Sequence, residues 1–164
     1  MAEKRDSSPK ENGSVIPETR VTTRPIDCDH PFASVVAGWV HDEWGAKEGR
    51  TFEETSQRLF DHATAPQTHA ATDSVEPLGV LSFVRFPRPD CAETGLWIDA
   101  LFVAPGHRGS GIGSLLVSLA CELARPFSDR LYVYTDQPDF YRRLGWSEIK
   151  PRDEAGCAVL ERIL

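Results

Sequence analysis

The chain has 164 residues, a length that fits one domain able to bury its own core. Its formal net charge of −7 argues against nucleic acid as the main partner, because proteins that bind a phosphate backbone usually present a basic face. No apolar run approaches the length of a membrane span, and the polar N-terminal segment lacks the apolar core of a signal peptide. We therefore expect a cytoplasmic protein that binds neither nucleic acid nor a membrane.

Residues that commonly bind metals are scattered along the sequence. Four cysteines stand far apart, at Cys28, Cys91, Cys121 and Cys157. Because no two of them have C-x-x-C spacing, they indicate neither a zinc site nor a redox pair. The histidines at His30, His62 and His69 also lack ligand spacing, so the sequence predicts no bound metal.

The first 18 residues differ in composition from the rest of the chain. They are rich in charge, serine, proline and glycine, and they show no periodic apolar positions. Such a composition is typical of a disordered tail. We expect this tail over residues 1–18 and a single domain over residues 19–164.

Apolar periodicity and turn residues divide the domain into strands and helices. Pro31 suits the first turn of a helix, and Thr51 with Glu54 forms a capping box. The predicted elements, in chain order, are a strand at 19–26, a helix at 31–44, a helix from 51, strands at 67–72, 78–86 and 96–103, a helix at 110–124, a strand at 130–135, a short helix near 138–143, and strands near 146–150 and 157–163. This order predicts a mixed α/β sheet.

A glycine-rich turn stands before the helix that is expected to start at Ser110. Gly109, Gly111 and Gly113 leave the backbone uncovered, and Arg108 adds a positive charge. Exposed amides at the start of a helix, together with its positive dipole end, favour an anion. The segment therefore predicts a phosphate-binding loop.

Two common glycine motifs do not fit this loop. A Walker loop needs lysine and then serine or threonine after its last glycine, but Gly113 is followed by Ser114 and Leu115. The dinucleotide fingerprint G-x-G-x-x-G needs a third glycine, and the two possible registers have Ser114 or Leu116 there. Both of these nucleotide-binding functions are disfavoured.

The hexapeptide at 108–113 does match R/Q-x-x-G-x-G/A, and through it the chain resembles the GCN5-related N-acetyltransferases. The preceding segment 97–105 resembles the fourth strand of that family, and 140–146 resembles its late FY-x-x-x-G-F/Y/W segment. The resemblance implies an α/β fold with a mixed, largely antiparallel central sheet flanked by helices. It also implies acetyl-CoA as the co-substrate.

In this family the fourth and fifth strands splay apart, and the pantetheine arm of acetyl-CoA pairs with the fourth. The resemblance therefore implies these cofactor-binding residues: Leu101, Phe102, Val103, Arg108, Gly109, Ser110, Gly111, Ile112 and Gly113. The amide of Val103, or that of its neighbour, is expected to hold the thioester oxygen.

Tyr141 is the expected general acid, because it stands four residues before Gly145, where the family commonly has its catalytic tyrosine. A phenol with a pKa of about 10 is protonated at neutral pH and can protonate a leaving thiolate. The alternative is a packing residue beside Phe140 and Trp146. The chain departs from a common form of the motif at Tyr134, where an asparagine is usual.

Asp99 is the expected base that deprotonates the acceptor amine. A carboxylate in the apolar run LWIDALFV is costly unless it has a partner or a task. Strand alternation predicts Asp99 on the same face as Trp97, Leu101 and Val103. The alternative for Asp99 is a structural ion pair with an arginine.

The segment after the first predicted helix supplies further candidates. The alternative bases are Glu43, His41 and water. The two side chains are candidates because this region lines the acceptor side in the family, and a solvated helix end also explains their presence. Trp39 recurs at helical spacing with apolar residues and is expected in the core. Trp44 is expected to wall the acceptor pocket.

The sequence thus predicts an enzyme that moves an acetyl group from acetyl-CoA to a primary amine. The family's mechanism implies direct attack in a ternary complex, with a small molecule or a peptide N-terminus as the acceptor. The alternative function is an acyl-CoA-binding sensor or interaction module without turnover. A homodimer is left open.

Overall fold

The computed structural model describes residues 20–73 and 75–164, so the tail expected over 1–18 lies outside the described residues. The strands are β1 (Thr22–Pro25), β2 (His69–Thr72), β3 (Pro77–Pro87), β4 (Thr94–Val103), β5 (Arg130–Thr135), β6 (Ser147–Lys150) and β7 (Ala158–Ile163). They form one sheet in the order β1-β2-β3-β4-β5-β7-β6. Neighbouring strands run antiparallel except β4 and β5, which are parallel. The predicted mixed, largely antiparallel sheet is confirmed.

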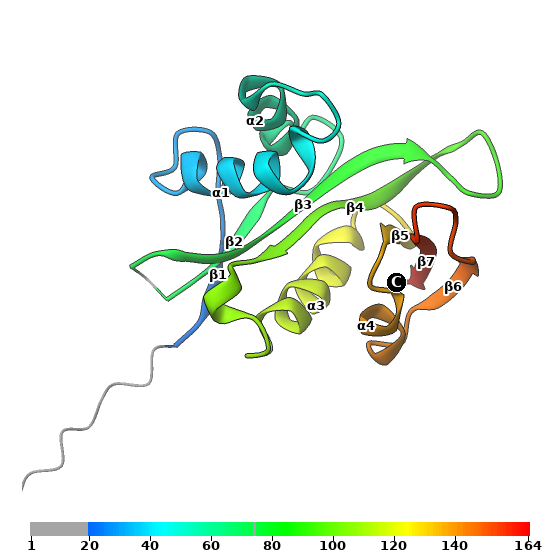
Figure 1. The fold of residues 1–164 in the computed structure, drawn as a ribbon. Coiled ribbons are helices and arrows are strands. Elements are labelled where there is room, and N and C mark those ends of the chain that lie inside the picture. The colour runs from blue at the N-terminus through cyan, green and yellow to red at the C-terminus, as the bar shows by residue number, and fades with distance from the viewer. Residues whose placement is uncertain (1–19, 74) are drawn as a thin grey trace, which may run out of the picture.

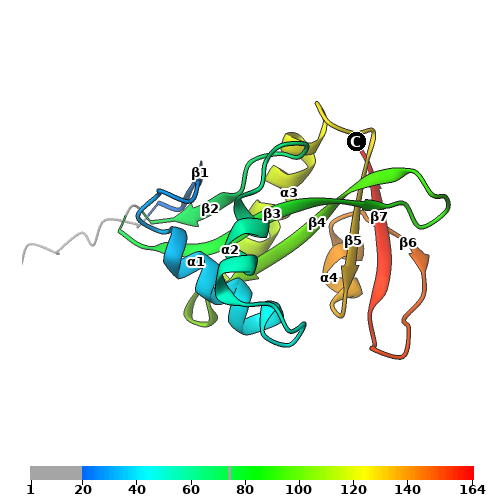
Figure 2. The same cartoon turned by 90° about the horizontal axis from the view of Figure 1, so that it is seen from above.

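Helices cover both faces of this sheet (Figures 1 and 2). On one face lie α1 (Ala33–Val40), the π-helical turn η1 (His41–Gly45) that continues it, and α2 (Phe52–Phe60). On the other face lie α3 (Ile112–Ala124) and α4 (Pro138–Arg143). The predicted capping box is present, because the Thr51 hydroxyl accepts from the Glu54 amide and the Glu54 carboxylate accepts from the Thr51 amide at 2.8 Å.

Each face has its own apolar core. On the α3 face, Leu116 and Val117 pack against buried residues of β3, β4 and β5. On the α1 face, Val36 and Val40 pack against a smaller set that includes Val80 and Ala100. Burial of one such aliphatic side chain contributes about 1.5–3 kcal/mol, so both faces of the sheet are held by their helices.

One extra residue in β4 changes which side chains face which helices. Ser82 of β3 pairs with Ala100, but the next residue, Phe83, pairs with Ile98, so Asp99 has no partner and forms a bulge. Ile98 and Leu101 therefore both pack on the α3 face, while Ala100 packs on the α1 face. The expectation that Asp99 shares a face with Leu101 is wrong, because strict alternation ends at the bulge.

The two halves of the sheet meet at a short parallel contact. β4 and β5 pair at Leu96 with Leu131 and at Trp97 with Tyr132. The Trp97 and Tyr132 rings lie 5.1 Å apart, and the indole N–H of Trp97 donates to the carbonyl of Phe86 at 3.2 Å. Beyond this contact β4 continues to Val103 with no described strand beside it on the β5 side.

Gly79 allows β3 to lie against the end of β4 and the start of α3. A Cβ at this position would lie 2.8 Å from the carbonyl oxygen of Phe102 and 3.1 Å from Cδ1 of Leu116. We predict that Gly79→Ala lowers the free energy of unfolding by about 1–3 kcal/mol, because the neighbouring backbone must shift. Urea denaturation measures this change.

Gly38 is the matched control, because a Cβ there meets nothing within 4 Å and the residue lies within α1. Gly38→Ala is expected to raise the free energy of unfolding by about 0.5–1 kcal/mol. Equal stability of Gly79→Ala and the unaltered protein would contradict the close packing at this point.

Candidate active site

The open edge of β4 presents backbone groups in a regular pattern. The amide of Ala104 donates to the Leu78 carbonyl of β3 at 2.9 Å. In an antiparallel pair alternate residues direct both polar groups to the same side, so Phe102 also faces β3. Leu101 and Val103 consequently direct their amides and carbonyls away from β3, toward the region where β5 has separated. Of the three residues whose backbone is expected to pair with the pantetheine arm, Leu101 and Val103 direct their polar groups toward the open edge. Phe102 directs its backbone groups toward β3 instead.

The glycine turn lies between the end of β4 and the start of α3. Gly109 and Gly111 have φ angles of +76° and +88°, a region that glycine adopts readily. The helix begins at Ile112 rather than at the expected Ser110, because this left-handed turn keeps the preceding residues outside it. No side chain in the described part of the chain caps α3, so its first amides are available to an anion.

Arg108 does not lie over the glycine turn in this structure. Its Nε donates to the Val103 carbonyl at 2.9 Å, and its guanidinium carbon lies 5.4 Å from the centre of the Phe102 ring. The side chain thus covers part of the open β4 edge. Ser110 contributes to the turn itself, because its hydroxyl donates to the His107 carbonyl at 2.5 Å.

Tyr141 lies in the core on the α3 face, with 4% of its surface exposed. Its ring makes edge contacts with Phe140 at 5.1 Å and Trp146 at 5.2 Å between ring centres. Phe140 in turn lies beside Gly113, where a Cβ would be 3.3 Å from its ring, so α4 packs against the start of α3. Burial raises the pKa of Tyr141, and the hydroxyl keeps its proton at neutral pH.

Asp99 forms an ion pair with an arginine that sequence reasoning did not identify. Arg58 of α2 donates from Nε to Oδ2 at 3.0 Å and from Nη2 to Oδ1 at 2.5 Å. The Asp99 side chain is 17% exposed and that of Arg58 is 41% exposed. Because the two residues are 41 positions apart, no local sequence signal could have paired them. The structural alternative given for Asp99 is therefore present.

His41 is oriented by α2. The Thr55 hydroxyl donates its proton to the Thr51 carbonyl at 3.0 Å, so at the 3.2 Å contact with His41 it must accept from Nδ1. A neutral His41 then carries its lone pair on Nε2. The carboxylate of Glu43, the other alternative base, lies 3.8 Å from the Lys47 ammonium, and the Glu43 side chain is 45% exposed.

The two tryptophans near η1 both contact Phe102. Trp39 stacks on its ring at 5.4 Å between centres, and Trp44 meets it edge-on at 6.3 Å. Trp39 is half-buried rather than fully in the core, and Trp44 is half-buried as well. The structure thus brings Phe102, Arg108 and η1 together at one side of the open edge, and places Tyr141 on the other face of the sheet.

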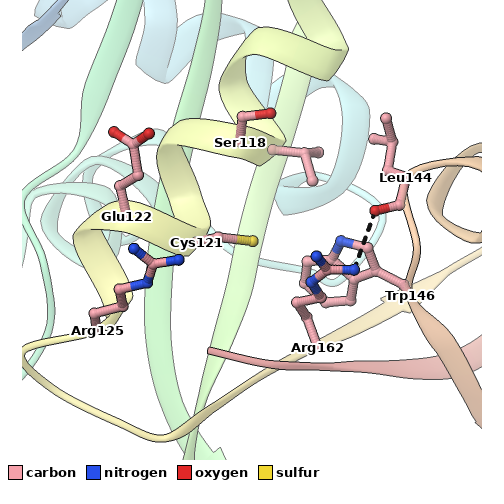
Figure 3. A pocket seen from close by; sticks show the side chains of 8 residues that line it. Ser118, Cys121, Glu122, Arg125, Leu144, Trp146 and Arg162 are labelled. Carbon is pink, nitrogen blue, oxygen red and sulfur yellow. Dashed lines mark hydrogen bonds between the residues drawn. The ribbon is translucent and has the colours of Figure 1, made fainter.

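A cavity of about 220 Å³ lies elsewhere, between α3 and the turn after α4 (Figure 3). Its lining includes Cys121 and Arg125 of α3, together with Trp146 and Arg162. Burial raises the pKa of the Cys121 thiol, so the thiol remains protonated at neutral pH. Since none of the candidate site residues line this cavity, we locate the site at the open edge of β4.

No group of three or more His, Cys, Asp and Glu side chains in residues 20–73 and 75–164 is placed to hold a metal ion. Within the same ranges, no helix has both the length and the apolarity to cross a membrane.

Sequence comparison finds a family and a relative. The model of the acetyltransferase (GNAT) family matches residues 36–146. A peptidyl-lysine N-acetyltransferase, YjaB, of Salmonella typhimurium is 35% identical over 83 residues, which are 50% of this chain and 50% of that protein. The chain thus spans about half the length of the curated relative that it matches.

Structural comparison finds the same fold in solved acetyltransferases. The crystal structure of aminoglycoside 6'-acetyltransferase type Ii has a TM-score of 0.67 and 20% identity, covering 87% of this chain and 96% of that one. An aminoglycoside 6'-N-acetyltransferase complexed with coenzyme A has a TM-score of 0.65 and 18% identity, with the same coverage of 87% and 96%. At these identities the likeness concerns the fold.

The Arg58–Asp99 pair connects α2 to the bulge of β4, and we predict a measurable coupling between its partners. In a double-mutant cycle of Arg58→Met and Asp99→Asn, the coupling free energy is expected to be about 1 kcal/mol, since the half-exposed arginine is screened by water. Urea denaturation of the four proteins measures it.

The exposed pair of Glu43 and Lys47, with side chains 45% and 69% exposed, gives the control cycle. Its coupling is expected to be about 0–0.5 kcal/mol. A coupling at Arg58 and Asp99 no larger than that of the control would show that this pair does not stabilise the bulge.

Proposed function

Because the chain belongs to the acetyltransferase (GNAT) family, we propose that it transfers the acetyl group of acetyl-CoA to an amine. The observation that carries this proposal is the position of the uncapped glycine turn at the end of the open β4 edge. One ligand with a pyrophosphate and an extended amide-containing arm can use both features. Acetyl-CoA has these two parts.

The residues present fit acetyl-CoA. The turn from Gly109 to Gly113 would hold the pyrophosphate through its amides and the positive end of α3. Leu101 and Val103 would pair with the pantetheine arm through the backbone groups that face away from β3. The amide of one of them would polarise the thioester carbonyl, as an oxyanion hole does.

The proposed reaction forms one bond and breaks another. The amine nitrogen bonds to the carbonyl carbon, and the carbon–sulfur bond breaks. The amine gives up one proton, and the departing thiolate takes one up. We assign the donor of the second proton to Tyr141, whose buried hydroxyl is protonated throughout the neutral range.

Two side chains are suited to take the proton from the amine. Asp99 lies at the bulge, but both of its oxygens accept from Arg58. His41 presents a lone pair on Nε2, and Trp44 of the same turn contacts Phe102 of β4. We therefore keep Asp99 as a proposed base, with His41 as its alternative.

The acceptor is proposed as an amine of a small molecule or of a peptide. The relative from Salmonella typhimurium is named for peptidyl-lysine, and two of the solved structures are named for aminoglycosides. Both kinds of acceptor carry an amine. A screen of acetyl-CoA consumption over polyamines, aminoglycosides, amino acids and peptides separates them.

Gly111→Val tests the proposed cofactor site. Valine disfavours the φ of +88°, so the turn must rearrange and redirect its amides, although a Cβ at this position would meet nothing within 4 Å. We predict that acetyl-CoA binding weakens by at least about tenfold, or about 1.4 kcal/mol, while the fold survives. Isothermal titration calorimetry measures the affinity.

Gly106→Val is the control, because it lies in the same loop, has no left-handed φ and meets nothing within 4 Å. It is expected to bind acetyl-CoA nearly as well as the unaltered protein. A folded Gly111→Val protein with full affinity would remove the assignment of the glycine turn.

Tyr141→Phe tests the proposed acid. The change keeps the ring between Phe140 and Trp146 and deletes the hydroxyl, so acetyl-CoA affinity should remain while kcat falls by about 10²-fold or more. Tyr132→Phe, at another buried tyrosine, should leave kcat nearly unchanged. If Tyr141→Phe turns over at the original rate with chemistry rate-limiting, another group protonates the thiolate.

A further inference from the structure

Three aromatic rings, which we name the aromatic cluster, gather beside the open edge of β4. Phe102 is at the centre, with Trp39 stacked at 5.4 Å and Trp44 edge-on at 6.3 Å. All three side chains are half-buried, so the cluster is neither a sealed core nor a free surface. Electron-rich ring faces at such a position attract positive charge.

The protein already places a cation on this cluster. The Arg108 guanidinium carbon lies 5.4 Å from the centre of the Phe102 ring, within the distance at which a cation and an aromatic face attract. No carboxylate within the described residues forms an ion pair with Arg108. The ring is therefore a main contact of this charge, together with the Val103 carbonyl.

Binding of acetyl-CoA would displace the Arg108 side chain from the Phe102 ring. Arg108 Nε donates a hydrogen bond to the carbonyl of Val103. This carbonyl faces the open edge, where the pantetheine arm is proposed to pair. The arm and the arginine compete for the same oxygen. When Arg108 leaves it, the face of Phe102 becomes free for another cation.

A ring that attracts cations stabilises the protonated form of an amine. The amine that is acetylated must lose its proton before it attacks, so this cluster is unsuited to the reacting nitrogen. It is suited to a second group that stays charged throughout the reaction. We propose that the acceptor carries, besides the reacting amine, a second positive charge that binds over the Phe102 ring in the place that Arg108 occupies here. This inference rests on the proposed function.

The test compares three probes of similar size: diaminobutane, butylamine and the neutral butanol. With CoA-saturated protein, the tryptophan fluorescence, to which Trp39 and Trp44 contribute, should respond to diaminobutane at roughly 3- to 30-fold lower concentration than to butylamine, and not to butanol. Turnover should show the same preference in KM. Equal responses to diaminobutane and butanol would overturn the proposal.

Phe102→Leu should abolish the preference for diaminobutane over butylamine, because leucine has no ring face. Phe86→Leu is the matched control, since Phe86 is 60% exposed and contacts Trp97 at the other end of β4. Arg108→Gln should let CoA-free protein bind diaminobutane more tightly, because the internal cation is gone. An unchanged preference in Phe102→Leu, or an unchanged affinity in Arg108→Gln, would contradict the shared position.

One further result distinguishes a peptide from a small diamine as the acceptor that carries the second charge. Another distinguishes failure of the proposed function from failure of this inference. A peptide with lysine next to its N-terminus should be preferred over one with norleucine there if the acceptor is a peptide, whereas a small diamine should exceed both if it is not. No calorimetric binding of acetyl-CoA and no turnover with any amine would defeat the proposed function. Turnover with equal KM for diaminobutane and butylamine would defeat this inference alone.

Discussion

Two parallel strands that pair at two positions and then separate leave backbone amides and carbonyls of β4 without a described strand on one side. Such groups are costly to bury unless they find a partner, and they are well suited to an extended ligand that carries its own amides. The rings of Trp97 and Tyr132, tilted by 34° with their centres 5.1 Å apart, contact each other at the point of separation. The proposed binding of pantetheine depends on this arrangement.

The bulge at Asp99 determines which side chains near the open edge of β4 face each side of the sheet. By adding one residue, it places Leu101 and Val103 against the α3 core and sends the Phe102 ring toward η1. Arg58 satisfies the carboxylate that the bulge leaves on the α2 side. The backbone proposed to hold acetyl-CoA and the ring proposed to hold part of the acceptor are thus neighbours in one strand.

Features encoded by adjacent residues could be predicted from the sequence. The capping box at Thr51 and the glycine turn each depend on a few consecutive residues, so the sequence alone predicts both. The sequence predicts the start of α3 at Ser110 rather than at Ile112 because it does not reveal the left-handed φ of Gly111. The bulge depends on how β3 pairs with β4, and the partner of Asp99 is 41 positions away, so neither had a local signal. The roles of Tyr141 and Asp99 in catalysis stay predictions.

Amide hydrogen exchange with and without acetyl-CoA tests most directly whether the open edge of β4 is the ligand's site. We expect acetyl-CoA to slow exchange at the amides of Leu101 and Val103 and at the first amides of α3. The amide of Phe102, already directed toward β3, should change little. Protection confined to other parts of the chain, or no protection on addition of acetyl-CoA, would contradict the account.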